Sequence, residues 1–503
     1  MSWSLRIRLS AMMFLQYAIW GAWAPVLWPQ LKAMGFSDPQ AGWVFGALWL
    51  ACIVAPFIGG QIVDRWFPTQ WFLAVVHLAG GVLLILNARE KEFGPFMTLM
   101  SIYTLLYAPT LALTNSLAFH HVKDAEKEFG FIRVFGTLGW IAAGWLLTFW
   151  RSDGVQTVMP RSADAGLLRP LGFLLLTSGV LYLILSGLLN RGAEKRQGYL
   201  AQAGVIALVG GLCSVGLLLA LGSLESFTKS FTDWTAQLRE LKRCDSLYLA
   251  GGMSLLMGVA CLFLPHTPPK KEAENPWAFM EAIQLLKNKN FAIFMAIAFI
   301  VTTELQFYYL PTAEFLENAV GIAQANVPAV MTTAQIAEIV AMAVLLPLLL
   351  PVIGMRKALA IGVIAWPLRY VVFALYQSVP YQVVVASLTL HGIGYTFFFV
   401  VSQIYVNKVA PADIRASAQA LLTLITLGIG SFLGTQFTAW IMALLSKTQI
   451  VVAEAGGAAK EVLVRDWTWI FLVPCFLTGA CAIAFLIWFK EPKDEGGEAK
   501  PNA

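Results

Sequence analysis

The chain has 503 residues, of which 58% are hydrophobic and 13% are charged. Charged residues make up about a quarter of a typical soluble domain, so this composition excludes an ordinary water-soluble protein and indicates one that is embedded in a bilayer. The formal net charge of +5 is spread over many short loops. We therefore interpret it as a signal for helix orientation and not for nucleic-acid binding.

Apolar runs that are long enough to cross a bilayer recur along the whole chain. A spanning helix needs about 20 mostly apolar residues, and helices are expected because lipid cannot satisfy free backbone groups. The sequence therefore predicts an all-α polytopic membrane protein. Its fourteen expected spans lie at residues 10–30, 41–62, 70–88, 95–118, 131–150, 170–190, 202–222, 247–264, 291–312, 327–350, 358–377, 380–405, 416–443 and 467–489.

Basic residues orient these spans, because positive loops favour the cytoplasmic side. The short turns RGAEKRQG (191–198) and GMRK (354–357) both fall inside when the N-terminus is placed inside, so both termini are predicted to be cytoplasmic.

The longest polar link on the cytoplasmic side is residues 266–290, which contains prolines and an amphipathic stretch. Such a segment suits a connection between two helix bundles. We expect an N-terminal bundle at 1–265, a C-terminal bundle at 291–490 and a cytoplasmic tail at 491–503.

Four charged side chains fall inside the expected spans, namely Arg133, Glu304, Glu338 and Arg369. Each costs about 2.5 to 3.5 kcal/mol at the centre of a spanning helix, so such a residue is expected to face a partner or a watery cavity on a transport route. Two plainer interpretations stay open. Glu304 and Arg369 could form a structural ion pair, and Arg133 could extend to the cytoplasmic interface.

Several polar and aromatic side chains in the spans recur at helical spacing and therefore share a helix face. Amides, an arginine fork and flat rings together suit a planar heterocycle that bears a polar ring. A nucleoside fits this description, and some sugars would also fit. The aligned sets are Arg133, Thr137 and Trp140; Thr332, Gln335 and Glu338; His391, Tyr395 and Phe398; and Gln306 and Tyr309.

Glu338 has a possible second role in proton coupling. Burial disfavours the charged form of a carboxylic acid, so a buried glutamate can take and release a proton near neutral pH. A neutral substrate gains nothing from the membrane voltage, whereas one accompanying proton contributes about 2.3 kcal/mol per 100 mV. His391 is a second candidate for this titration.

Ordered motifs resemble a known family. GGQIVDRW (59–66) resembles the loop signature of the major facilitator superfamily, in which an acidic and a basic residue, here Asp64 and Arg65, form a structural ion pair that latches helices on the cytoplasmic side. FLQYAIWGAW, YAPTLALTNS, IRVFGTLGW, ELQ, QIAE, AWPLRY and IRASAQ, in that order, look closely like the bacterial nucleoside/proton symporters of that superfamily.

This resemblance implies a nucleoside site between two six-helix bundles in a bacterial inner membrane. The positions that match the family's motifs for substrate binding are Arg133, Thr137, Trp140, Gln306, Gln335 and Glu338.

Four further positions of the expected substrate site depart from the family pattern. His391 stands where the family has a tyrosine, Tyr395 where it has a phenylalanine, and Tyr309 where it has an asparagine. Thr396 stands where the family has an aspartate that is linked to proton coupling. Glu338 is then the first candidate for coupling, and His391 is the second.

Residues 151–246 are an insertion relative to the family's short loop between its fifth and sixth helices. The insertion contains the expected spans 170–190 and 202–222. These two spans bring the total number of expected spans to fourteen. Because an added pair crosses the membrane once in each direction, every later helix keeps the orientation that it has in the family. The alternative is twelve spans with a re-entrant or surface insertion.

The sequence therefore predicts a monomeric secondary transporter that imports nucleosides with protons by alternating access. It would lie among membrane lipids. We expect no metal, since the six scattered cysteines form no paired motif, and we expect no cofactor. The alternatives are a carrier of another polar metabolite, such as a sugar, without proton coupling, and a transporter-like sensor or membrane enzyme. Against an enzyme, the chain lacks a metal motif, a phosphate-binding glycine loop and catalytically spaced carboxylates.

Overall fold

The structure is a computed structural model that describes most of the chain. The two expected spans of the insertion, the pair Asp64–Arg65 and the tail 491–503 lie outside the described residues, as does part of the linker 266–290. The described residues are 3–58, 67–121, 129–151, 244–268, 278–411, 414–451 and 460–490.

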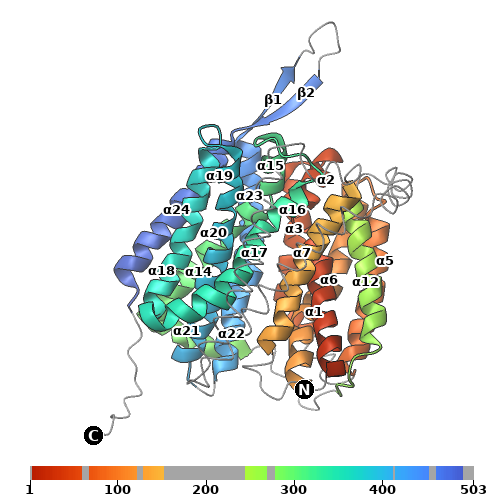
Figure 1. The fold of residues 1–503 in the computed structure, drawn as a ribbon, viewed down its shortest axis with the longest axis vertical. Helices are drawn as coiled ribbons and strands as arrows, with labels where there is room; N and C mark the ends of the chain where they lie inside the picture. The colour runs from red at the N-terminus through yellow and green to blue at the C-terminus, as the bar shows by residue number, and fades with distance from the viewer. Residues whose placement is uncertain are drawn as a thin grey trace, which may run out of the picture.

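In the described residues before 262, six long helices and one short helix form a bundle (Figure 1). Close backbone approach lets these helices pack tightly. A Cβ on Gly139 would lie 2.0 Å from the carbonyl oxygen of Phe14, so only glycine permits this crossing. The helices are α1 (Trp3–Trp23), α2 (Leu27–Ala33), α3 (Asp38–Ile58), α5 (Thr69–Asn87), α6 (Phe93–His121), α7 (Gly130–Arg151) and α12 (Asp245–Cys261).

The helices after residue 288 form the second bundle, which α13 (Ala278–Ala282) and the 3-10 turn η4 (Ile283–Lys287) precede. Three of its segments are π-helical, namely η5, η6 and η8. The elements are α14 (Lys289–Tyr309), α15 (Thr312–Asn318), α16 (Val327–Met331), α17 (Thr333–Val340), η5 (Ala341–Leu345), α18 (Leu346–Ala374), α19 (Tyr381–Ser387), α20 (Thr389–Gly394), η6 (Tyr395–Val400), α21 (Val401–Val409), α22 (Arg415–Thr423), η8 (Leu424–Gly430), α23 (Ser431–Leu444) and α24 (Trp467–Trp488).

Gly354 interrupts α18. Its φ of 77° and ψ of 168° lie in a region that favours glycine, and the chain turns there from one rod into the next. This break separates the expected spans 327–350 and 358–377.

Eight helices in the described part of the chain are long and apolar enough to cross a membrane. Large apolar side chains such as Val75, Phe263 and Trp488 are more than half exposed on the outer surface. Exposed apolar surface of this extent marks contact with lipid, so the structure agrees with the membrane class that the composition predicts.

A two-stranded hairpin departs from the all-α prediction. β1 (Ser446–Val451) pairs antiparallel with β2 (Lys460–Arg465), and Ser446 lies opposite Arg465. The hairpin projects from the end of the molecule opposite to the start of α1 (Figure 1). Two β-branched stretches flank a Gly-Gly pair here, a hairpin signal that analysis of the apolar runs alone overlooks.

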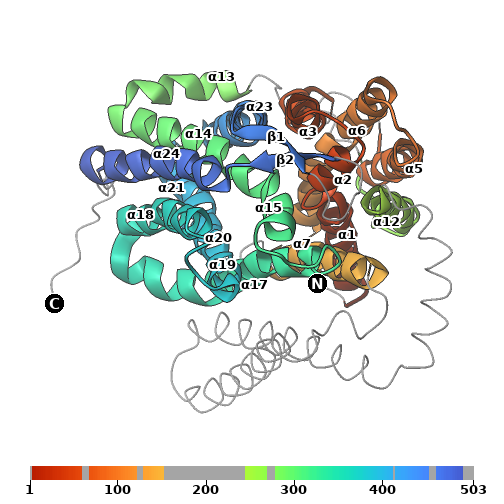
Figure 2. The same ribbon diagram turned by 90° about the horizontal axis from the view of Figure 1, so that it is seen from above.

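The two bundles lie side by side when viewed from the hairpin end (Figure 2). Between them, α15 packs beside α2, and α16 and α17 pack beside α7. Hydrogen bonds join the bundles near the hairpin end; among them, the Gln436 side chain donates to the Gly42 carbonyl at 3.1 Å, and the Ala329 amide donates to the Thr148 hydroxyl at 3.0 Å. This arrangement leaves a pocket between the two bundles.

Candidate functional site

The central pocket takes its walls from both bundles. The N-terminal bundle contributes Arg133, Thr137 and Trp140 from α7, and the C-terminal bundle contributes Gln306 from α14 and Glu338 from α17. Polar side chains that are far apart in the sequence therefore converge on one hollow. Among the predicted site residues, those that line it are Arg133, Thr137, Trp140, Gln306, Tyr309, Gln335, Glu338 and Tyr395, and Phe398 lines it too.

Arg133 lies in the pocket and does not extend to an interface. Its guanidinium carbon is 4.1 Å from the centre of the Tyr17 ring. A cation over an aromatic face is attracted by the ring quadrupole, by roughly 2 kcal/mol or more when desolvated. This contact holds the arginine fork in place while its N–H donors face the hollow, where Glu338 also lies. The two charged groups line the same pocket from different bundles and are not ion-paired within 4.0 Å.

Aromatic rings form one wall of the pocket. The Trp20 ring centre is 5.4 Å from that of Trp140 and 5.7 Å from that of Trp49, in edge-to-face arrangements. Tyr309 continues the wall from the other bundle, 6.4 Å from Trp140. Such a wall offers both flat faces and ring edges to a planar ligand.

The pocket also offers buried amides. Neither the nitrogen nor the oxygen of the Gln306 side chain has a hydrogen-bond partner in the protein, and the Gln335 oxygen has none either. A buried amide without a partner costs about 1 to 3 kcal/mol, so these atoms are suited to bind polar groups of a ligand.

Backbone packing fixes the position of Glu338. Gly392 on α20 lies so close to α17 that a Cβ there would be 2.2 Å from the Glu338 amide nitrogen. The Thr396 hydroxyl donates to the Glu338 carbonyl at 3.5 Å. The carboxylate therefore projects into the pocket from a helix that cannot easily shift.

Two of the predicted site residues lie behind the pocket. His391 and Thr396 are fully buried, and neither belongs to the lining. The His391 ring packs 4.1 Å from Tyr308, 6.0 Å from Tyr309 and 6.3 Å from Tyr395. His391 therefore supports two pocket tyrosines from the second layer.

The direct ion pair considered for Glu304 and Arg369 is absent at the 4.0 Å limit, although both side chains are described and fully buried. The Nη1 of Arg369 instead donates to Nδ1 of His391 at 3.0 Å. Neither carboxylate oxygen of Glu304 has a hydrogen-bond partner. The sequence places both charges inside apolar spans, but it does not show in which direction each side chain points.

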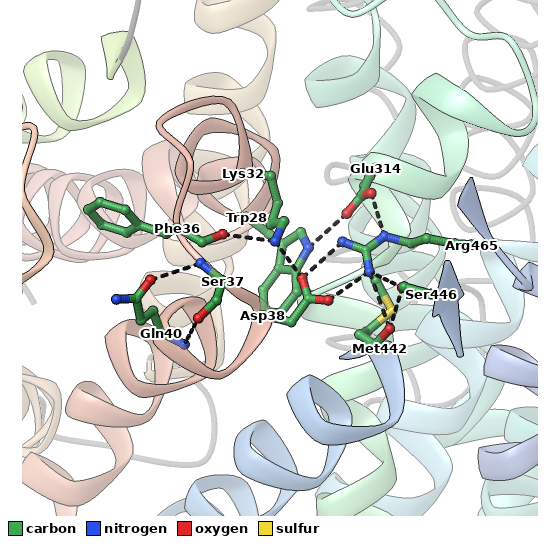
Figure 3. Close-up of polar contacts among 10 residues, drawn as sticks. All are labelled: Trp28, Lys32, Phe36, Ser37, Asp38, Gln40, Glu314, Met442, Ser446 and Arg465. Carbon is green, nitrogen blue, oxygen red and sulfur yellow. Dashed lines mark hydrogen bonds and ion pairs between the residues drawn. The ribbon is translucent and has the colours of Figure 1, made fainter. Parts of the chain in front are cut away.

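A cluster of charges joins the two bundles at the hairpin end (Figure 3). Arg465 of β2 makes two bonds of 2.9 Å to the Asp38 carboxylate, and its Nε donates to Glu314 at 2.6 Å. Lys32 lies 2.8 Å from Asp38, and the Trp28 indole donates to Glu314 at 2.8 Å. We call these five residues the hairpin-end cluster. Its nearly buried, hydrogen-bonded charges bind the two bundles to each other at that end.

The pocket extends toward the opposite end. Gln403 on α21 and Thr423 on α22 line it and are exposed, and both helices lie at the end away from the hairpin (Figure 1). The two bundles are thus bonded to each other at one end, while lining residues are exposed toward the other end. A carrier needs such an asymmetry in each of its two states.

Sequence reasoning missed part of the lining. Tyr17, Trp20 and Trp49 line the pocket, but aromatic residues in a spanning helix more often pack in the core or against lipid. Tyr17 and Trp20 are three residues apart, which was the available signal. Thr302, Thr426 and Ser431 also line it and carry no distinguishing pattern.

Similarity to known proteins extends over most of the chain. The family model described as "Nucleoside H+ symporter" matches residues 3–161 and 209–494, so it passes over 162–208, which is part of the expected insertion. The putative nucleoside transporter YegT of Escherichia coli K12 is 31% identical over 97% of this chain and 94% of its own length. The xanthosine permease of the same organism is 24% identical over 98% and 97%.

Solved structures show the same fold. The crystal structure of the nucleoside transporter NupG has a TM-score of 0.67 at 21% identity and covers 97% of this chain and 100% of that one. A D-xylose-proton symporter has a TM-score of 0.59 at 13% identity, over 98% and 99%. From the match of the family model and the identity to YegT, this chain belongs to the nucleoside H+ symporter family.

Proposed function

We propose that this protein imports nucleosides together with protons by alternating access of the central pocket. The observation that carries the proposal is the composition of the pocket, in which Arg133 from one bundle faces Gln306, Gln335 and Glu338 from the other. A substrate held between the two halves couples its own binding to their relative movement, as a rocking carrier requires.

The lining fits the chemistry of a nucleoside. Trp20, Trp140 and Tyr309 offer flat surfaces for a base, while the amides of Gln306 and Gln335 can both donate to and accept from its ring edge or the ribose hydroxyls. The names of the relatives, two nucleoside carriers and a xanthosine permease, favour this substrate class over a sugar. The likeness to a xylose symporter concerns the fold alone.

The topology proposed here places both termini in the cytoplasm, with the inserted pair of spans giving fourteen crossings. The hairpin then lies on the outer side, and the conformation closed by the hairpin-end cluster is the one that faces the cytoplasm. The protein acts as a monomer, since each chain supplies both halves of the pocket.

Binding and carriage test the proposal separately. Nucleosides at about a hundredfold excess over Kd should stabilise the purified protein by about 2.7 kcal/mol, because they bind the native state alone, whereas sugars should leave its melting temperature unchanged. Counterflow of labelled uridine or adenosine in proteoliposomes would then distinguish a carrier from a sensor. A protein that is stabilised by sugars and not by nucleosides would contradict the substrate assignment.

Glu338→Gln should weaken nucleoside binding and uncouple uptake from the proton gradient. Loss of a charge-assisted hydrogen bond costs about 1.5 to 3 kcal/mol, which is about tenfold or more in Kd, and an amide cannot carry the proton. The measurement is accumulation of labelled nucleoside in vesicles that are acidified outside. Glu92→Gln, at an exposed carboxylate in a loop, is the control and should behave as wild type. Concentrative uptake by the Glu338 variant would remove this residue from coupling.

A further inference from the structure

A second group of ionisable side chains lies behind the substrate pocket, in the C-terminal bundle. Glu304 of α14, Arg369 of α18 and His391 of α20 are each 0% exposed, and none of them lines the pocket. Buried charges of this kind are costly and mark functional positions in membrane proteins.

The carboxylate of Glu304 makes neither a direct ion pair nor a hydrogen bond within the described part of the protein. Neither of its oxygens has a hydrogen-bond partner, and no cation of the described residues lies within 4.0 Å. An isolated ionised carboxylate in a dry interior is so unfavourable that the group takes up a proton instead. Such a site favours the neutral carboxylic acid over the carboxylate.

Arg369 remains charged, because a guanidinium is not deprotonated in proteins. Its Nη1 donates to His391 Nδ1 at 3.0 Å, while its Nε and Nη2 are buried without acceptors. The rings of Tyr308, Trp366 and Tyr370 surround its guanidinium carbon at 4.6 to 4.9 Å. Arg369 thus has unused donors and no carboxylate partner.

The groups that face Glu304 come from two neighbouring helices. On α18 these are Arg369, which acts on Glu304 electrostatically, and Tyr370, whose hydroxyl donates to the Glu304 carbonyl at 3.0 Å. On α24 they are the thiols Cys475 and Cys481.

The other elements packed on α14 offer no nearer partner. The segments η8 and α23 contain no charged or titratable side chain. Glu314 on α15 is held by Arg465, and Lys287 on η4 is exposed. Arg369 is therefore the cation that an ionised Glu304 would attract.

His391 connects this group to the pocket. Because Arg369 always donates, Nδ1 of His391 must accept, so a second proton on His391 would have to displace Arg369. The His391 ring lies 6.0 Å from Tyr309 and 6.3 Å from Tyr395, and both tyrosines line the pocket. A movement of Arg369 would thus change the packing of two tyrosines that line the substrate pocket.

We propose that Glu304 is a proton-carrying site that communicates with the substrate pocket through Arg369 and His391. When water reaches the Glu304 acid in the other state of the carrier, the O–H bond breaks, the proton passes to that water, and the carboxylate attracts the Arg369 guanidinium away from His391. His391 then loses its donor, and its packing against Tyr309 and Tyr395 changes. The inference rests on the proposed nucleoside–proton symport. It places Glu304 as a second carboxylate beside Glu338 on the path of the same proton, and it supplies a carboxylate where Thr396 lacks one.

Glu304→Gln separates this role from substrate binding. The amide imitates the neutral acid but cannot release a proton. Counterflow requires only the loaded carrier to change sides, so we expect wild-type counterflow and wild-type nucleoside Kd at equal pH. Net uptake requires proton release, so accumulation under an acid-outside gradient should fall to about the equilibrium level, from the roughly fortyfold that one proton supports at 100 mV. Nucleoside-driven proton entry, followed with a pH dye in the vesicles, should also disappear.

Three controls make the outcome decisive. Glu304→Asp keeps a carboxylic acid and should restore measurable accumulation, and Glu92→Gln should behave as wild type. If the glutamine variant does not bind nucleoside, accumulation is measured with Glu304→Met instead, because an apolar side chain of similar length suits a dry site. Accumulation by either neutral variant at the wild-type level would overturn the proposal. A wild-type protein that carries nucleosides without protons would instead contradict the proposed function.

Discussion

Arg133→Ala and Gln306→Ala should each abolish measurable nucleoside binding while the protein still folds. Arg133 is the cation of the pocket lining, and Gln306 is an amide with no other partner in the protein. The substitutions therefore remove substrate contacts, and within the protein the Arg133 variant also loses the contact with the Tyr17 ring. Loss of a central binding residue costs about 2 to 4 kcal/mol, which is about 30- to 1000-fold in Kd. Titration calorimetry or thermal-shift measurements with uridine and adenosine give the change in Kd.

Arg89→Ala is the matched control for the arginine variant, because Arg89 is exposed in a loop. It should bind nucleosides as wild type does. Unchanged affinity in both Arg133→Ala and Gln306→Ala would remove the two residues from the substrate site and, with them, the assignment of the pocket.

Arg465→Met should open the hairpin end. Arg465 is the one side chain in the hairpin-end cluster that bonds both Asp38 and Glu314 (Figure 3), and its loss leaves two nearly buried carboxylates with a single lysine. Breaking such a network costs about 3 to 5 kcal/mol. This cost falls on the closed state alone, so the population should shift toward a conformation open on the hairpin side.

Nitroxide labels at Lys91 and Gln377, on a cysteine-free background, measure this shift. Both positions are exposed at the hairpin end, one in each bundle, so the distance between them should lengthen in the variant. Lys447→Met removes an exposed basic residue from the same hairpin and should leave the distance distribution unchanged. An unaltered distribution in Arg465→Met would show that the cluster does not determine closure.

Much of the site could be predicted because the membrane makes polar residues rare. Arg133, Gln306 and Glu338 stood out in apolar spans at helical spacing, and the structure brings all three to one pocket. The break at Gly354 also lies between two of the expected spans, 327–350 and 358–377.

The rest depends on contacts that no local pattern encodes. Arg465 and Asp38 are separated by 427 positions, and their bond depends on the meeting of two bundles. The orientation of Arg369 toward His391, and away from Glu304, follows from side-chain packing. Trp20 and Trp49 resemble ordinary core aromatics until the fold places them beside Trp140.

The most direct test of the account is uptake of labelled uridine or adenosine by the wild-type protein in proteoliposomes that are acidic outside and negative inside. Symport with one proton predicts accumulation of about fortyfold per 100 mV and its collapse on addition of a protonophore. Uptake that stops at equal concentrations on both sides, with or without the gradient, would contradict proton-coupled nucleoside import.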